Sequence, residues 1–177
     1  AILDDYANMG RAALLLFDAT GEKGYLDHAR AWTGIVEQQH LDAAGGGYFL
    51  AGAQVDDLIA RSKNAYDNAV PAGNGTMVEV LARLHYLTGE PVYRQRAEAL
   101  LGAFGGESAE HLVNMPTLLI GALFLATGTQ VVIAGDAGDT RTLALIDAAQ
   151  RAPAPAVMVL RVVPGTALPV GHPAAGK

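Results

Sequence analysis

The chain has 177 residues and no cysteine, and its 18 Asp and Glu residues outnumber its 12 Lys and Arg residues, for a formal net charge of −6. This length predicts one domain that is large enough to bury a core. The lack of cysteine excludes disulfides, Cys-ligated metals and thiol nucleophiles, and a cytoplasmic location fits it best. The acidic balance, without a basic cluster, argues against nucleic-acid and membrane partners. The longest apolar stretch, 118–126, is about half of a membrane-spanning helix.

The first forty residues predict one helical hairpin. Apolar residues at spacings of three and four indicate a helix over 1–19, which ends at Thr20-Gly21-Glu22, and a second helix over 25–41. The chain opens directly in the first helix, as we expect of a fragment of a longer polypeptide. Three consecutive glycines then break the chain, and a short β-hairpin formed by 48–50 and 58–59 is expected after them.

A second hairpin repeats the first at an offset of 68 residues. Its first helix is predicted from about Asn74 to Thr88-Gly89-Glu90, and Pro91 opens its second helix. The matched pairs are Met9/Met77, Leu16/Leu84, Thr20/Thr88, Gly21/Gly89, Glu22/Glu90, Tyr25/Tyr93 and Ala29/Ala97. A fixed period of one helical hairpin predicts a stacked or toroidal α/α array. The first helices of the two hairpins then run in the same direction. Their N-termini share one end with the long connection, residues 42–73, where a functional site is expected.

The last third of the chain changes from helical to mixed structure. A fifth helix over 109–126 is apolar almost all round, so we expect it to be buried on all sides. A strand over 130–134, a helix from Asp139 to 152 and a strand over 156–163 predict a βαβ-like appendix. The predicted organisation is a helical-hairpin part over 1–128, a small α/β appendix over 129–163 and an irregular tail over 164–177.

Three segments carry a resemblance to a known family. They are Arg61-Ser-Lys-Asn-Ala-Tyr-Asp-Asn-Ala-Val-Pro-Ala-Gly-Asn-Gly75, Leu3-Asp-Asp-Tyr-Ala7 and Gly46-Gly-Tyr-Phe49. Over about residues 1–163 the chain resembles the C-terminal part of the YyaL-like family of spermatogenesis-associated, thioredoxin-domain-containing proteins. The resemblance implies a mainly α fold, namely a partial (α/α)6 toroid of helical hairpins. That toroid belongs to the six-hairpin glycosidase superfamily, is similar to N-acylglucosamine 2-epimerases and normally follows a thioredoxin-like domain.

The chain departs from the family pattern in three ways. It contains about two and a half of the six hairpins and lacks the thioredoxin-like domain. The usual Pro-Ser-Gly-Asn-Ser motif is Pro71-Ala-Gly-Asn-Gly75 here, without either hydroxyl. Asn64 stands where the resemblance implies an acidic residue. The resemblance therefore bears more on the fold than on the activity.

Carboxylates near the shared helix N-termini are the candidates for chemistry. Sugar enzymes use paired carboxylates as acid and base, and Asp5 and Asp67 are the predicted catalytic pair. Tyr6, Lys63 and Asn74 are predicted to bind the substrate. The alternatives are structural: Asp5 favours a helix N-terminus through capping and the helix dipole, and Asn74 caps the helix that follows it. In either case Lys63 and Asp67, four residues apart, are expected to form a buried ion pair.

The remaining polar residues give weaker signals. Asp56 and Asp57 are further candidates for a carboxylate in the long connection. The histidines have none of the spacings typical of metal ligands, and the two serines lie outside any nucleophile motif. Gly135-Asp-Ala-Gly138 lacks the residues of a phosphate-binding loop and is interpreted as a βα turn. No metal and no cofactor are expected, and whether the chain is an enzyme stays open.

Two hypotheses for function follow. The first is a carbohydrate-processing or carbohydrate-binding toroid, epimerase- or glycosidase-like, of which this chain is a fragment that is inactive alone. The second is a non-enzymatic module that supports a thioredoxin-like redox partner. Because two and a half hairpins cannot close a ring, the first and fifth helices are expected to expose apolar flanks. The expected partner is the remaining part of the toroid or a second copy of the chain.

Overall fold

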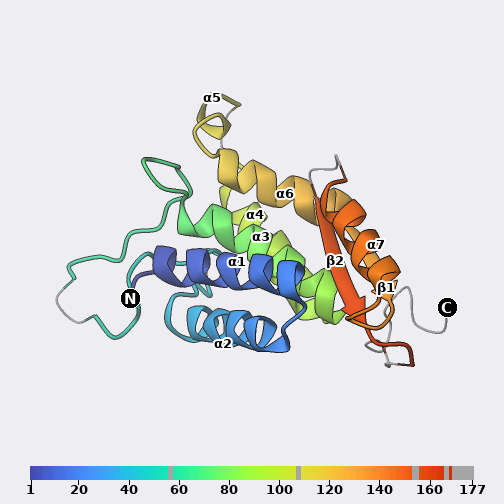
Figure 1. Cartoon of the computed structure of the whole chain (residues 1–177). Helices are drawn as coiled ribbons and strands as arrows, with labels where there is room; N and C mark the ends of the chain where they lie inside the picture. The colour runs from blue at the N-terminus through green and yellow to red at the C-terminus, as the bar shows by residue number, and fades with distance from the viewer. Residues whose placement is uncertain (56–57, 107–108, 153–155, 166–167, 169–177) are drawn as a thin grey trace.

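The computed structural model describes residues 1–55, 58–106, 109–152, 156–165 and 168. Its elements in chain order are α1 (Leu3–Thr20), α2 (Lys23–Gln39), α3 (Gly73–Thr88), α4 (Pro91–Phe104), α5 (Ala109–Leu112), α6 (Pro116–Thr127), β1 (Thr129–Ala134), α7 (Thr140–Gln150) and β2 (Val157–Val162). The prediction of a mainly helical chain with a small α/β unit after the helices is confirmed (Figure 1).

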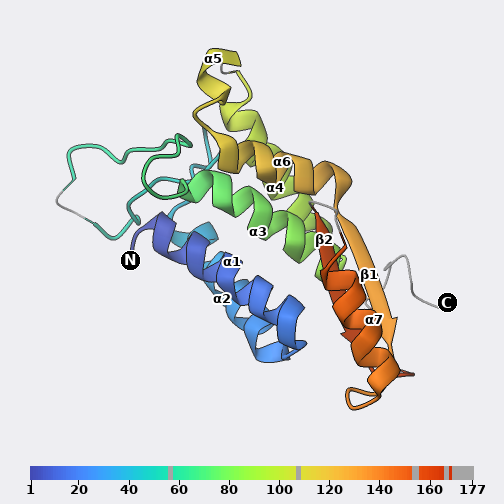
Figure 2. The same cartoon turned by 45° about the horizontal axis from the view of Figure 1, so that its top comes forward.

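Helices α1, α3 and α6 lie in a row and run in the same direction (Figure 1 and Figure 2). α3 is in the middle and packs against both of the others, while α2 packs on α1 and α4 packs on α3. The N-termini of the three helices lie at one end of the row, beside residues 41–72, and we call this the long-loop end. The opposite end, where each hairpin turns, is called the turn end. The predicted direction of α1 and α3 is therefore confirmed.

The two hairpins close with the same turn. Gly21 and Gly89 have φ angles of 75° and 72°, a left-handed conformation that glycine adopts without steric cost. The hydroxyls of Thr20 and Thr88 each donate to the carbonyl oxygen four residues earlier, at 2.7 Å. Each also accepts from the amide two residues later, at 3.1 and 3.2 Å. The two turns therefore make the same hydrogen bonds, as the predicted repeat requires.

Two glycines allow α3 and α6 to pack closely. A Cβ atom on Gly121 would lie 2.7 Å from Cβ of Val78, and one on Gly75 would lie 2.7 Å from the backbone nitrogen of Leu118. Both distances are too short for a side chain, so the helix backbones approach each other directly. With α1 on its other side, α3 is buried over almost its whole length.

A buried carboxylate joins the helices of the row. The Glu79 side chain on α3 accepts from Nε of Arg11 on α1 at 2.9 Å and from Nε of Arg83 at 2.8 Å. The Arg83 guanidinium also lies 4.4 Å from the ring centroid of Phe124 on α6. Because Arg83 is buried as well, loss of Glu79 would leave its guanidinium without a carboxylate in the core.

The βαβ appendix packs against the turn end. β1 and β2 form a parallel pair, with Thr129 opposite Val157, and α7 covers one face through Ile146. Asp139 caps α7 by accepting from the backbone nitrogen of Arg141 at 2.8 Å. The predicted strand, helix and strand, with Asp139 as the cap, are therefore confirmed.

Side chains from α1 and β2 fasten the appendix to the helices. The carboxylate of Asp18 accepts from the backbone nitrogen of Val159. The guanidinium of Arg161 donates to the backbone oxygen of Ala19 and, at 3.5 Å, to that of Thr20. A cation at the C-terminal end of a helix bonds carbonyls that have no partner inside the helix.

The predicted β-hairpin in the long connection is wrong. Among the described residues of 48–59 there is no strand, and the only pairing there is one isolated antiparallel bridge between Leu41 and Tyr48. The backbone of Tyr48 is bonded to a side chain instead, as described below, and the backbone nitrogen of Leu50 donates to the Ser62 oxygen at 2.8 Å. Ile59, the second half of the expected hairpin, is fully exposed.

The predicted helix over 109–126 is also corrected. It is divided into α5 and α6, because Pro116 lacks a backbone N–H and suits only the first turn of a new helix. α6 is not buried on all sides: the large apolar side chains that it exposes are Leu119, Ile120 and Leu123.

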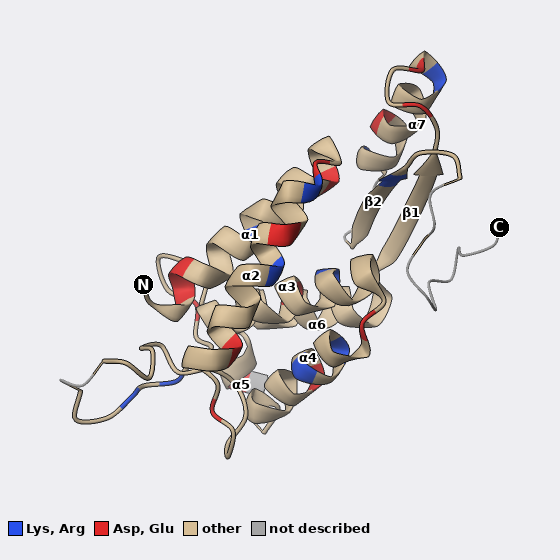
Figure 3. Ribbon diagram, turned by 90° about the horizontal axis from the view of Figure 1, so that it is seen from below, with Lys and Arg blue, Asp and Glu red and all other residues tan. Residues whose placement is uncertain are grey.

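Apolar side chains are exposed on the outer flanks of the row, as predicted. On α1 they are Met9, Leu15 and Leu16, and on α6 they are the three named above. Lys and Arg residues are spread over several elements rather than gathered on one face (Figure 3). No helix within the described part of the chain has the length and apolar character needed to cross a membrane.

Candidate functional site

Aspartates bond the helix N-termini at the long-loop end. Asp5 accepts from the backbone nitrogen of Ile2 at 3.0 Å, a bond within the first turn of α1. Asp4 accepts from the Gly73 nitrogen of α3 at 2.9 Å. Asp67 accepts from the Ala72 nitrogen at 2.7 Å through one oxygen and, through the other, from the Thr117 nitrogen of α6 at 2.7 Å. Carboxylates are stabilised at helix N-termini, so this cluster orders the end of the row.

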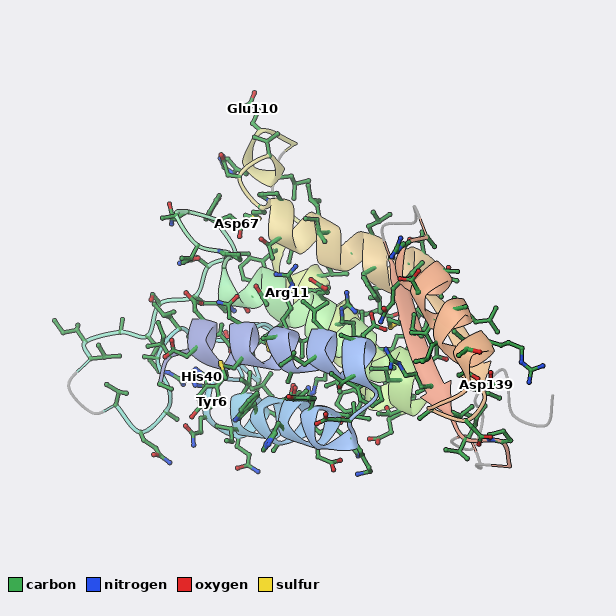
Figure 4. All side chains as sticks on the ribbon, viewed as in Figure 1. Tyr6, Arg11, His40, Asp67, Glu110 and Asp139 are labelled. Atoms are coloured by element: carbon green, nitrogen blue, oxygen red, sulfur yellow. The ribbon has the colours of Figure 1, made fainter. Side chains whose placement is uncertain are left out.

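Asp4 and Asp67 bind consecutive backbone amides. The amide of Ala72 points to Asp67 and that of Gly73 points to Asp4, so the two carboxylates meet at the start of α3. Asp67 lies beside the beginning of α6 (Figure 4). Both of its oxygens are bonded to backbone, so its visible role is to join the loop, α3 and α6.

Asn74 organises the loop around it. Its Oδ1 accepts from the Tyr48 nitrogen at 2.9 Å, and its Nδ2 donates to the backbone oxygens of Tyr48 at 2.9 Å and of Asn64 at 2.8 Å. The residue is buried and lies inside α3, whose N-cap is Ala72, so the predicted capping role is wrong. The amide instead holds two loop segments against the helix.

Lys63 pairs with a different aspartate from the one predicted. Its Nζ lies 2.7 Å from Oδ2 of Asp42 and 2.6 Å from the Gly46 oxygen. The predicted Lys63–Asp67 ion pair is therefore wrong. The hydrogen bond from Lys63, together with the Gly45 amide, lowers the pKa of Asp42 to about 2. This pair fixes the glycine turn of the long connection.

Tyr48 and Tyr6 are two aromatic residues that make further contacts at the long-loop end. The hydroxyl of Tyr48 donates to Glu37, which lies 2.9 Å from Nε of Arg96, and burial beside Glu37 raises the pKa of Tyr48. Tyr6 packs edge-on against His40 with ring centroids 5.9 Å apart, and the two lie close together in Figure 4. His40 is fully buried and its Nδ1 is 2.9 Å from the Phe49 oxygen.

A cavity of about 190 Å³ opens at the long-loop end. We call it the long-loop cavity; its lining residues are Leu3, Asp4, Leu50, Asn64, Tyr66, Asn68, Val70, Ala72 and Asn74. The side-chain amides of Asn64 and Asn68 and the hydroxyl of Tyr66 make no hydrogen bond to any residue that the structure describes. The cavity thus combines apolar side chains with exposed polar groups that a small molecule can reach.

Asp4 is the carboxylate in this cavity. Burial is the main cause that raises its pKa, and the neighbouring charge of Asp5 adds to it, while the bond from Gly73 acts in the opposite sense. A carboxyl whose pKa is raised holds a proton closer to neutral pH, which is a property of general acids.

Other hollows lie at the seam between α1 and the appendix, with volumes of about 280 and 190 Å³. Their polar side chains include Asp18, Gln150 and Arg161, each of which bonds the appendix to α1. These hollows therefore offer fewer unbonded polar groups than the long-loop cavity, which is the candidate site.

Of the predicted site residues, Asn74 lines the long-loop cavity. Asp5, Tyr6, Lys63 and Asp67 are not among its lining residues, and their predicted catalytic and binding roles stay predictions. Asp56 and Asp57 lie outside the described residues.

From the sequence we did not predict Asn68 as a cavity residue and did not choose Asp4 over Asp5. The signal for Asn68 was its position in the same motif as Asp67. Within the described part of the chain, no three His, Asp or Glu side chains are placed to hold a metal ion.

Comparison with known proteins relates the chain to part of a longer protein. No family profile matches the chain. It is 36% identical to Spermatogenesis-associated protein 20 of Rattus norvegicus over 146 residues, which are 80% of this chain and 18% of the relative. The proteins of the same name from Mus musculus and Homo sapiens are each 34% identical over the same shares. The chain is a distant homologue of a segment of these proteins and spans 18% of their length.

Proposed function

We propose that the long-loop cavity binds a small carbohydrate, and that the chain forms part of an (α/α)6 toroid. The observation that carries the proposal is the set of polar groups that line the cavity. The amides of Asn64 and Asn68 and the hydroxyl of Tyr66 make no hydrogen bond within the described structure, and the Asp4 carboxylate uses one oxygen for the bond from Gly73. Amides and a carboxylate match the many hydroxyls of a sugar, and an aromatic side chain adds apolar contact area.

The volume limits the ligand to one sugar unit. About 190 Å³ is below the roughly 300–1,000 Å³ of sites for larger ligands. Acid–base sugar chemistry uses two groups, whereas Asp4 is the one carboxylate among the lining residues of the cavity. The second group would come from Asp5, from Asp67 after a rearrangement, or from a neighbouring hairpin. The chain alone is therefore proposed to bind without turnover.

Titration of the isotope-labelled chain with N-acetylglucosamine and with glucose tests the binding proposal. We expect saturable shifts of the Asn64 and Asn68 side-chain amide signals, with a Kd of about 1 mM. Asn64→Ala removes a group that makes no internal side-chain bond, and it should raise the Kd by about 3–10-fold. Asp147→Asn, on the exposed side of α7 and away from the cavity, should leave it unchanged. Linear shifts that do not saturate, or equal effects of the two variants, would reject the proposal.

The second candidate function is a non-enzymatic module that supports a thioredoxin-like partner. It is favoured by the internal bonds of Lys63, Asp67 and Asn74, which hold the loop rather than leaving these groups open. In the same labelled chain, a thioredoxin-fold protein would then shift backbone signals over a surface, while sugars would shift none.

A further inference from the structure

A pocket lies between α2 and α4, the second helices of the two hairpins. It has a volume of about 170 Å³ and shares no lining residue with the long-loop cavity, and we call it the α2–α4 pocket. One side of the pocket is a single face of α2, formed by residues three and four positions apart: Arg30, Thr33, Gly34 and Glu37. The other side comes from α4, with Val92, Tyr93 and Arg96.

Thr33 places an unbonded hydroxyl in this pocket. The residue is 4% exposed, and its Oγ1 makes no hydrogen bond to any residue that the structure describes. The hydroxyls of Thr20 and Thr88, which also lie in helices, donate to the carbonyl oxygen four residues earlier, whereas that of Thr33 does not. A buried hydroxyl without a partner lowers stability, so a ligand that enters the pocket and bonds this group removes that penalty.

Arg96 supplies a charged donor from the opposite side of the pocket. Its Nε lies 2.9 Å from Oε2 of Glu37, and its two terminal nitrogens make no hydrogen bond to a described residue. The Arg96 side chain is 42% exposed, so a small molecule can reach it. The terminal N–H groups of a guanidinium form a planar fork that matches the two oxygens of a carboxylate.

The charges around the pocket favour an anion with a single charge. Among the lining residues, Arg30 and Arg96 carry two positive charges and Glu37 carries one negative charge, which leaves a net charge of +1. Arg30 is also paired with Glu90 at 2.7 Å, and Glu37 accepts from the Tyr48 hydroxyl. A phosphate dianion would therefore bring excess negative charge close to Glu37, whereas one carboxylate balances the charge of the pocket.

The rest of the lining suits a short apolar group. Val92 is exposed and Tyr93 is half-buried, so both side chains offer apolar surface to the pocket. A Cβ atom on Gly34 would meet no described atom within 4 Å, which leaves open space beside the backbone of α2. The volume of about 170 Å³ is below the roughly 300–1,000 Å³ of sites for larger ligands, so an acid with a short aliphatic chain is the class that fits.

We propose that the α2–α4 pocket binds a small monocarboxylate, whose oxygens accept from the terminal N–H groups of Arg96 and from the hydroxyl of Thr33. The aliphatic part of this ligand lies against Val92 and Tyr93. The inference goes beyond the proposed function and is independent of it, because the two sites have no lining residue in common.

Titration of the isotope-labelled chain with butyrate tests this proposal, with butyramide as an uncharged control of similar shape. We expect butyrate to shift the Thr33 signals saturably, with a Kd of about 1 mM. Butyramide should bind at least about tenfold more weakly, because it lacks the charge that the Arg96 fork recognises. Neither compound should shift the side-chain amide signals of Asn64 and Asn68, and glucose should not shift those of Thr33.

Two variants remove the proposed contacts one at a time. Thr33→Val keeps the shape of the side chain and deletes a hydroxyl without an internal partner, so it should raise the Kd by about 3–10-fold without lowering the free energy of unfolding. Arg96→Gln should raise the Kd at least about tenfold. Arg94→Gln is its matched control and should leave the Kd unchanged, since Arg94 is a similarly exposed arginine of α4 that pairs with Glu98 at 2.8 Å and does not line the pocket.

Four results would overturn the proposal. Equal binding of butyrate and butyramide would leave no role for a carboxylate, and equal effects of Arg96→Gln and Arg94→Gln would assign the binding to general surface charge. Tighter binding of inorganic phosphate than of butyrate would make the pocket a phosphate site. A loss of stability in Thr33→Val without a change in Kd would place the hydroxyl in the core rather than in a site. Because butyrate and sugars are followed through different signals, failure of either proposal is distinguishable from failure of the other.

Discussion

The two ends of the helical row differ in how they use charged side chains. At the long-loop end, the aspartates at 4 and 67 accept bonds from the N-terminal amides of α3 and α6. At the turn end, the guanidinium of Arg161 donates to the C-terminal carbonyls of α1. The helix dipole explains both choices, since anions are stabilised at N-termini and cations at C-termini.

The two ends also differ in the polar groups that are left without a hydrogen bond once these bonds are made. At the turn end, Asp18 and Arg161 join the appendix to α1. At the long-loop end, the polar groups of Asn64, Asn68 and Tyr66 remain unbonded around a cavity within the described structure. One end is therefore a joint between two parts of the chain, and the other retains groups that a ligand can use.

The substitution expected to lower the free energy of unfolding most is Asn74→Ala, at the long-loop end. It leaves the backbone nitrogen and oxygen of Tyr48 and the oxygen of Asn64 without their buried partner. We expect a loss of about 3 kcal/mol or more in the free energy of unfolding, measured with denaturant. Asn68→Ala is the control and should change it by less than about 0.5 kcal/mol. Equal effects of both variants would mean that Asn74 does not organise this end.

Asp67→Asn tests the joint between the loop, α3 and α6. An amide NH2 group would replace one acceptor oxygen and face a backbone N–H, either that of Ala72 or that of Thr117. We expect destabilisation by about 1–3 kcal/mol in the same unfolding measurement. Asp5→Asn, on the exposed first turn of α1, should cost less. Full stability of Asp67→Asn would instead favour the predicted catalytic role of this carboxylate.

Arg161→Met tests the turn end. It removes the donors to the last carbonyls of α1 while keeping an apolar stem of similar length. We expect a loss of about 1–2 kcal/mol and faster hydrogen exchange in β2 and in the last turn of α1, with no change around the long-loop cavity. Arg141→Met, on the exposed start of α7, is the matched control. Faster exchange at both ends would show that the two ends are not independent.

The substitution expected to change stability least is Asp42→Asn, which removes the Asp42–Lys63 pair, and its effect depends on pH. The pKa of Asp42 is about 2 in the folded chain and 3.8 without its partners, so folding favours the ionised form of this carboxyl group. The pair therefore stabilises the fold above about pH 4, and this contribution is lost as the pH falls from 3.8 towards 2. Asp42→Asn should be less stable than the parent chain at pH 5 and should approach it at pH 2. A difference that does not vary with pH would contradict this assignment.

The repeat, the hairpin turns and the appendix could be predicted because local signals determine them. Gly21 and Gly89 end helices where a left-handed conformation is required, and Asp139 caps α7 where a strand has just ended. The exposure of apolar residues on α1 also followed from the number of hairpins.

The bonding inside the long connection could not be predicted, because it depends on contacts between distant residues. Lys63 meets Asp42, 21 residues away, rather than Asp67. The Tyr48 backbone pairs with the Asn74 side chain, 26 residues away, rather than with a second strand. Choosing Asp4 over Asp5 required the orientation of α1, since successive residues point in directions about 100° apart.

The bond between Asp18 and Val159 joins residues 141 positions apart. At about 5–20 residues per second, a ribosome completes α1 roughly 7–28 s before it adds Val159. During that interval β2, which supplies the donors to the last carbonyls of α1, has not yet been synthesised. Docking of the appendix is thus a late step in synthesis, and it closes one of the longest loops of the chain.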